Sequence, residues 1–127
     1  MIFTGNSIRH KFVANSLSKE VDSSLIISEC INSDWLSNQS NENVSIIEHF
    51  KQRHITEKEI FSGNNFFIGN VLPILYKEVN LQFVFETIQE FEPDVMFVFG
   101  SSIIKDPILS LTPKAFVNLH LGISPYY

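Results

Sequence analysis

The chain has 127 residues, a length that suits one domain with a substantial apolar core. Hydrophobic residues make up 44% of it and charged residues 18%, which excludes a disordered or fibrous chain. Its net charge of −5 argues against non-specific binding to nucleic acid or anionic lipid. The single cysteine, Cys30, excludes an internal disulfide framework and a cysteine-based zinc site, so we expect a reducing, cytoplasmic location.

The first half of the chain alternates between short apolar runs and helical spacing. Residues 1–4 predict a buried strand, and the apolar positions between Ile8 and Leu17 predict a helix capped by Asn6 or Ser7. Residues 25–27 predict a second strand. Eight of the fourteen residues from 32 to 45 are Asn or Ser, so we expect a polar surface loop there. No segment has the length of a signal peptide core or a membrane span, and no membrane partner is expected.

The second half shows the same alternation more clearly. A helix is predicted over 46–61, then a brief strand at 66–68 that Gly69, Asn70 and Pro73 break off. Asn80 is expected to cap a helix over 81–91 that Pro93 ends. Residues 95–99 are apolar without alternation, which is typical of a strand covered on both faces. A short helix over 107–111, a strand over 115–121 and a loop over 122–127 complete the pattern.

This order predicts one α/β domain over 1–127, Rossmann-like, with a mostly parallel sheet flanked by helices. Ligands of such sheets gather at the carboxyl ends of the strands. Those ends are expected at residues 4–7, 100–104 and 118–127.

Asn118 and His120 are the most informative pair of polar residues. On one strand they leave the same face, while Val117, Leu119 and Leu121 leave the other and can pack. Histidine can move protons near neutral pH, and an asparagine amide can stabilise an oxyanion. Spacing alone equally fits an edge strand with two solvent-facing polar residues.

The segment around this pair resembles the signature of the folate-dependent formyltransferases, which include sugar N-formyltransferases and methionyl-tRNA formyltransferase. The shared features are Asn118-x-His120 at a strand end, a loop with Pro125 and Tyr126, and the preceding helix, apolar strand and Gly100. They cover residues 81–127. Many members have Ser where this chain has Gly122, and the family's catalytic Asp would lie beyond Tyr127. The resemblance therefore implies the N-terminal portion of such a domain, truncated before its end and inactive as an isolated chain.

The resemblance implies transfer of a formyl group from 10-formyltetrahydrofolate to a substrate amine. Asn118 would stabilise the oxyanion and His120 would shuttle protons. The co-substrate would bind a turn formed by Phe99, Gly100, Ser101, Ser102, Ile103 and Ile104. Without the resemblance, that turn is equally an ordinary connection between a strand and a helix.

A third candidate site is the first turn, formed by Gly5, Asn6 and Ser7. A glycine turn that leads into a helix can bind an anionic part of a substrate, and Arg9, His10 and Lys11 add positive charge. The alternative is that the turn only joins strand to helix. His10, His49 and His54 are expected to be surface or cap residues, because their spacing does not make a metal site, and no metal is predicted.

The acceptor is expected to be a small-molecule amine, such as a nucleotide-linked amino sugar, with a charged tRNA left open. One alternative is a formyltransferase-like α/β module that binds a ligand without catalysis. Another is a flavodoxin-like or receiver-like domain, but the acidic cluster that such a domain needs after the first strand is absent.

Overall fold

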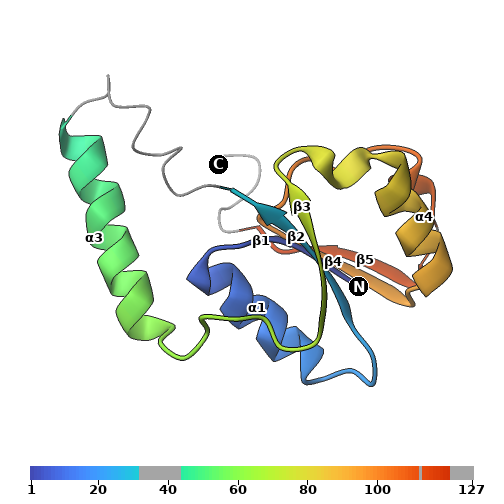
Figure 1. The fold of residues 1–127 in the computed structure, drawn as a ribbon, viewed down its shortest axis with the longest axis horizontal. Helices are drawn as coiled ribbons and strands as arrows, with labels where there is room; N and C mark the ends of the chain where they lie inside the picture. Colours follow the sequence, from blue (N-terminus) through green and yellow to red (C-terminus); the bar gives the residue numbers. More distant parts are fainter. Residues whose placement is uncertain (32–43, 112, 121–127) are drawn as a thin grey trace.

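A computed structural model describes residues 1–31, 44–111 and 113–120. Its strands form one parallel sheet in the order β3-β2-β1-β4-β5 (Figure 1), which confirms the Rossmann-like α/β fold. The strands are β1 (Ile2–Gly5), β2 (Leu25–Cys30), β3 (Asn70–Leu75), β4 (Val95–Phe99) and β5 (Ala115–Asn118). The helices are α1 (Ile8–Ser18), α3 (Val44–Ile60) and α4 (Gln82–Phe91), with the short 3-10 helices η1 (Glu78–Asn80) and η2 (Ile108–Ser110).

The central strands carry apolar side chains on both faces, because helices cover both. Phe3 and Met96 lie on the face that packs against α4 through Val84 and Ile88. On the other face, a smaller cluster joins strand residues to Ala14 of α1. This arrangement explains why residues 95–99 are apolar without alternation.

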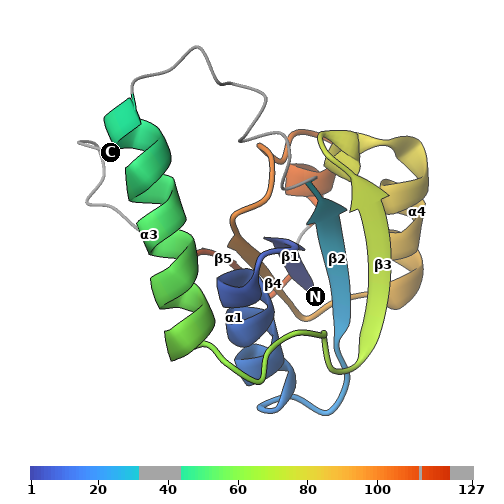
Figure 2. The same ribbon diagram turned by 60° about the vertical axis from the view of Figure 1, so that its left-hand side comes forward.

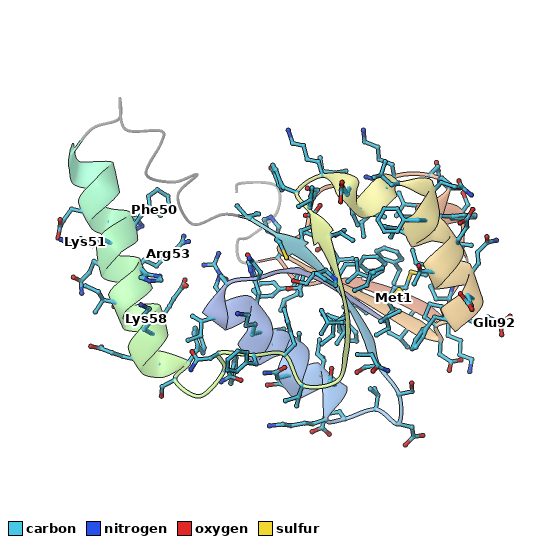
Figure 3. The ribbon with its side chains drawn as sticks, in the orientation of Figure 1. Met1, Phe50, Lys51, Arg53, Lys58 and Glu92 are labelled. Carbon is cyan, nitrogen blue, oxygen red and sulfur yellow. The ribbon has the colours of Figure 1, made fainter. Side chains whose placement is uncertain are left out.

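Helix α3 lies beside α1 and stands off from the sheet (Figure 2). The carboxylate of Glu57 accepts from Arg9 of α1 at 2.9 Å and pairs with Arg53 of α3 at 3.3 Å, and Phe12 packs on Phe61. Figure 3 shows Arg53 and Phe50 projecting from α3 toward the rest of the molecule, whereas Lys51 projects away. The helix begins at Val44, two residues before the predicted start and inside the predicted polar loop, whose residues 32–43 lie outside the described part.

The prediction of a strand at 66–68 followed by broken structure was wrong. The third strand is Asn70–Leu75, paired in register with β2 so that Pro73 lies opposite Ser28. Proline is tolerated there because β3 is an edge strand, whose outward N–H groups need no partner in the sheet.

Two helix boundaries also differ from the predictions. Leu81, rather than Asn80, is the N-cap of α4, and it makes no side-chain cap hydrogen bond. Asn80 ends the 3-10 helix η1, and its side chain bonds a neighbouring loop instead. The predicted helix over 107–111 is a single 3-10 turn, Ile108–Ser110.

The last strand is shorter than predicted and its apolar face is not packed. It ends at Asn118, and Val117 and Leu119 are 38% and 46% exposed, so the expectation that they pack was wrong. The physical reason is position, because β5 lies at the edge of the sheet and all four of its residues are exposed. Leu121 lies outside the described residues.

Candidate functional site

The carboxyl ends of β1, β4 and β5 lie side by side at one edge of the sheet. Thr4 is level with Phe99, and Val98 is level with Asn118. The strand order reverses between β1 and β4, because β1 leads to β2 and β3 on one side and β4 leads to β5 on the other. Such a reversal is where open α/β sheets bind their ligands.

Asn118 is the last residue of β5, and the sheet pairing extends one residue further. The N–H of Leu119 donates to the carbonyl of Val98 at 2.9 Å, so His120 follows directly beside the end of β4. Asn118 and His120 are both exposed. The argument from strand alternation reaches only Asn118, because His120 lies beyond the strand, and a common face for the two side chains stays a prediction.

The loop after β4 is held by side chains from two other loops. Gly100 has a φ of 73°, a backbone conformation that favours glycine. The N–H of Ser102 donates to Glu29 Oε2 at 2.6 Å. The amide of Asn80 donates to the carbonyl of Ile103 at 2.8 Å and accepts from the N–H of Lys105 at 2.7 Å. The loop is therefore fixed before any ligand arrives.

Two groups of this loop are available to a ligand. The side chain of Ile103 is 80% exposed, although Ile104 beside it belongs to the core. The hydroxyl oxygen of Ser102 is buried and has no hydrogen-bond partner in the structure. Phe99, by contrast, is largely committed, because its carbonyl accepts from Thr4 Oγ1 at 2.8 Å and its ring packs on His10.

The residues of the first turn, which were predicted to bind substrate, use their side chains internally. Asn6 bonds the main chain of Ile31 twice, as donor and as acceptor, each at 3.3 Å. The hydroxyl of Ser7 lies 2.9 Å from His10 Nδ1. Gly5 is buried as the last residue of β1.

The prediction that His10 is a surface or cap residue was wrong. His10 is 9% exposed, and its ring lies 5.0 Å from that of Phe99 in an edge-to-face arrangement. Gly5 and Gly100 flank it, since a Cβ on Gly5 would lie 2.6 Å from Nδ1 and a Cβ on Gly100 would overlap Nε2. The imidazole therefore fills the crevice between β1 and β4. His49 and His54 are exposed on α3, as predicted.

His10 is a neutral packing group at physiological pH. Burial, and secondarily the positive charges of Arg9 and Arg53, lower the pKa of His10 from its ordinary 6.5 to about 4. A charged imidazole in this crevice would lose hydration without gaining an anionic partner. His10 therefore shapes the carboxyl edge and does not add positive charge to the first turn.

Glu29 is a buried residue that the sequence reasoning treated only as the boundary of a strand. It lies inside β2, one strand repeat after Ile27, whose side chain is in the core. Its two carboxylate oxygens accept from the N–H groups of Lys77 and Ser102 at 3.0 and 2.6 Å. The available signal was a carboxylate in register with inward-facing residues of a central strand.

Within the part of the chain that the structure describes, no three His, Cys, Asp or Glu side chains gather in a way that could hold a metal ion. Across the same residues, no helix is long and apolar enough to cross a membrane. No protein-family model, curated protein or solved structure matches this chain.

Proposed function

We propose that this chain forms the donor-binding part of a folate-dependent formyltransferase, which transfers a formyl group from 10-formyltetrahydrofolate to a substrate amine. The observation that carries the proposal is the register between β4 and β5. It brings Asn118, the first residue of the Asn-x-His signature, to the level of Val98, two residues before Gly100. The polar signature and the loop after β4 thus belong to one edge of the sheet.

The loop after β4 has the properties that a flat heterocycle such as a pterin requires. Ile103 offers an exposed apolar side chain, and Ser102 offers a hydroxyl without a protein partner. Its backbone is held in place by Glu29 and Asn80, which lowers the entropy that ligand binding must cost. These residues fit the donor half of the reaction.

The chemistry asked of the two signature residues matches their side chains. When formyltetrahydrofolate is bound, it supplies an activated formyl carbonyl. The amide N–H of Asn118 can donate to the carbonyl oxygen as negative charge develops there. The imidazole of His120 can take a proton from the attacking amine and return one to the leaving nitrogen. Because both residues are exposed at the edge, a substrate can reach them.

The acceptor in this proposal is a small molecule that carries an amine, for example an amino sugar linked to a nucleotide. Its place would be beside the first turn, next to β4. Because the side chains of Asn6 and Ser7 are already bonded, this turn would contact the acceptor mainly through backbone groups. The proposal therefore assigns recognition of the amine to the edge and not to a charged pocket.

Isothermal titration of the full-length protein with a hydrolysis-stable 10-formylfolate analogue tests the proposal. We expect binding in the micromolar range and formyl transfer that depends on Asn118 and His120. Binding without transfer in any amine screen would favour the non-catalytic binding module. Absence of binding would refute the assignment.

A further inference from the structure

The carboxylate of Glu29 connects three loops at the carboxyl edge of the sheet. Glu29 lies at the end of β2 and is 1% exposed. One of its oxygens accepts from Lys77, which follows β3, and the other accepts from Ser102, which follows β4. The partners are 48 and 73 residues away along the chain. Glu29 thus links segments that no strand pairing joins.

Both bonds require a carboxylate. A carboxamide of the same shape has one oxygen that accepts and one nitrogen that only donates, so glutamine could satisfy one of the two N–H groups. None of the ion pairs found among the described residues involves Glu29, and the side chain of Lys77 lies over the ring of Tyr76 instead. The buried charge is therefore balanced by backbone dipoles, an arrangement that is stable only while both donors stay in place.

The bond to Ser102 sits in the middle of the proposed donor site. It fixes the main chain between Gly100, whose φ is positive, and Ile103, whose side chain is exposed. Asn80 fixes the far end of the same loop through Ile103 and Lys105. Without Glu29, the near half of the loop would keep only its covalent link to β4.

We propose that Glu29 is a positioning residue for the folate site, because its carboxylate holds the Gly100–Ile104 loop in the form that binds the donor. This inference rests on the proposed function. Glu29 touches no reacting atom and acts through the N–H of Ser102. A loop that is ordered for only part of the time binds its ligand more weakly by that fraction.

The test uses Glu29→Gln, with Glu78→Gln as its matched control. Glu78 also accepts from a backbone N–H, that of Leu75 at 2.8 Å, but its bond is exposed and lies outside the donor loop. For Glu29→Gln we expect the Ser102 amide to exchange its hydrogen about tenfold faster or more, the effect of losing a hydrogen bond to a charged group. The dissociation constant of the folate analogue should rise about tenfold. Glu78→Gln should leave both quantities within twofold of wild type.

General destabilisation is separated from positioning by a second amide. The N–H of Phe97, bonded to the carbonyl of Met1 at 2.9 Å in the sheet, should exchange at the wild-type rate in a folded Glu29→Gln protein. If that protein does not fold, Glu29→Asp replaces it, since the shorter carboxylate keeps the charge and reaches only one of the two amides. The same thresholds then apply.

The outcomes distinguish the two proposals. If wild type binds the analogue and the Glu29 variant binds it within twofold, or exchanges its Ser102 amide at the wild-type rate, the positioning role is overturned and the proposed function stands. If wild type does not bind the analogue, the proposed function fails, and the role of Glu29 at a folate site fails with it. Weaker binding together with faster Ser102 exchange and unchanged Phe97 exchange supports the inference.

Discussion

The buried imidazole of His10 makes the stability of this protein sensitive to mild acid. In the folded state His10 takes up a proton only near pH 4, because burial and the charges of Arg9 and Arg53 lower its pKa from 6.5 to about 4. In the unfolded chain it takes up a proton near pH 6.5. Between these two values the unfolded state binds more protons, so lowering the pH favours unfolding. The stabilisation is complete above pH 6.5 and is lost progressively as the pH falls to 4.

The size of this effect follows from the difference between the two proton-binding constants. Each pH unit between 6.5 and 4 costs about 1.4 kcal/mol, which gives about 3 kcal/mol over the whole window. Between pH 7 and pH 5, where most carboxyl groups stay ionised, the expected loss is about 2 kcal/mol. That is a large share of the roughly 5–15 kcal/mol by which small domains are stable.

Urea unfolding followed by circular dichroism at several pH values from 7 to 5 measures this loss. The comparison protein is His10→Asn, which leaves space between Gly5 and Gly100 and is less stable at pH 7, but has no titrating ring in the crevice. Its free energy of unfolding should change much less with pH than that of wild type. His54→Asn, which replaces an exposed histidine on α3, should keep the wild-type dependence. Equal pH dependence in wild type and His10→Asn would refute the reasoning.

Three further changes test the packing and the chemistry of the edge. Gly100→Ala should cost about 2–4 kcal/mol in urea unfolding, because φ is 73° and the new Cβ meets His10, whereas Gly63→Ala, with a φ of 90° and no atom within 4 Å, should cost only about 1–2 kcal/mol. A smaller loss at Gly100 than at Gly63 would contradict the crevice packing. In the full-length enzyme, His120→Ala should lower kcat about 10²–10⁴-fold and Asn118→Ala about 10²–10³-fold. Both should leave unfolding within about 0.5 kcal/mol of wild type, because the residues are exposed, and turnover within a few-fold of wild type would end their catalytic assignment. Glu57→Gln should loosen α3 from α1, which amide exchange in α3 detects as faster opening at a cost of about 1 kcal/mol, and unchanged exchange would show that the ion pairs do not hold the helix.

The fold could be predicted from the sequence where periodicity was strong. The run at 95–99 and the alternation of strand and helix were enough for the parallel sheet, because buried parallel strands are apolar on both faces. The strand containing Pro73 was missed because proline reads as a breaker unless the strand is known to lie at an edge. Edge position is a property of the whole sheet, and no local pattern records it. The same limit made Val117 and Leu119 look like packing residues, although β5 is an edge strand with both faces exposed.

The candidate site was predictable only in part, for a related reason. The level of Asn118 beside β4 follows from parallel pairing of neighbouring strands. The positions of His10 and Glu29 do not follow from periodicity. His10 is in the first turn of α1, and it is buried because that turn faces the reversal point of the sheet. Glu29 reads as a polar strand end until its two backbone partners, which are far away in the sequence, are known.

The polar residues at the carboxyl edge fall into two groups, and the division bears on function. Thr4, His10 and Glu29 are buried, and each has a partner within the protein. Their side chains are occupied with holding the ends of β1, β2 and β4 together, so they are poor candidates for chemistry on a substrate. Asn118 and His120 lie at the same edge but are exposed, where a substrate can approach them. A buried polar group without a partner costs free energy, so the framework had to be satisfied internally, whereas a reacting group must stay accessible. That contrast favours the Asn-x-His pair over His10 as the reactive part of this edge.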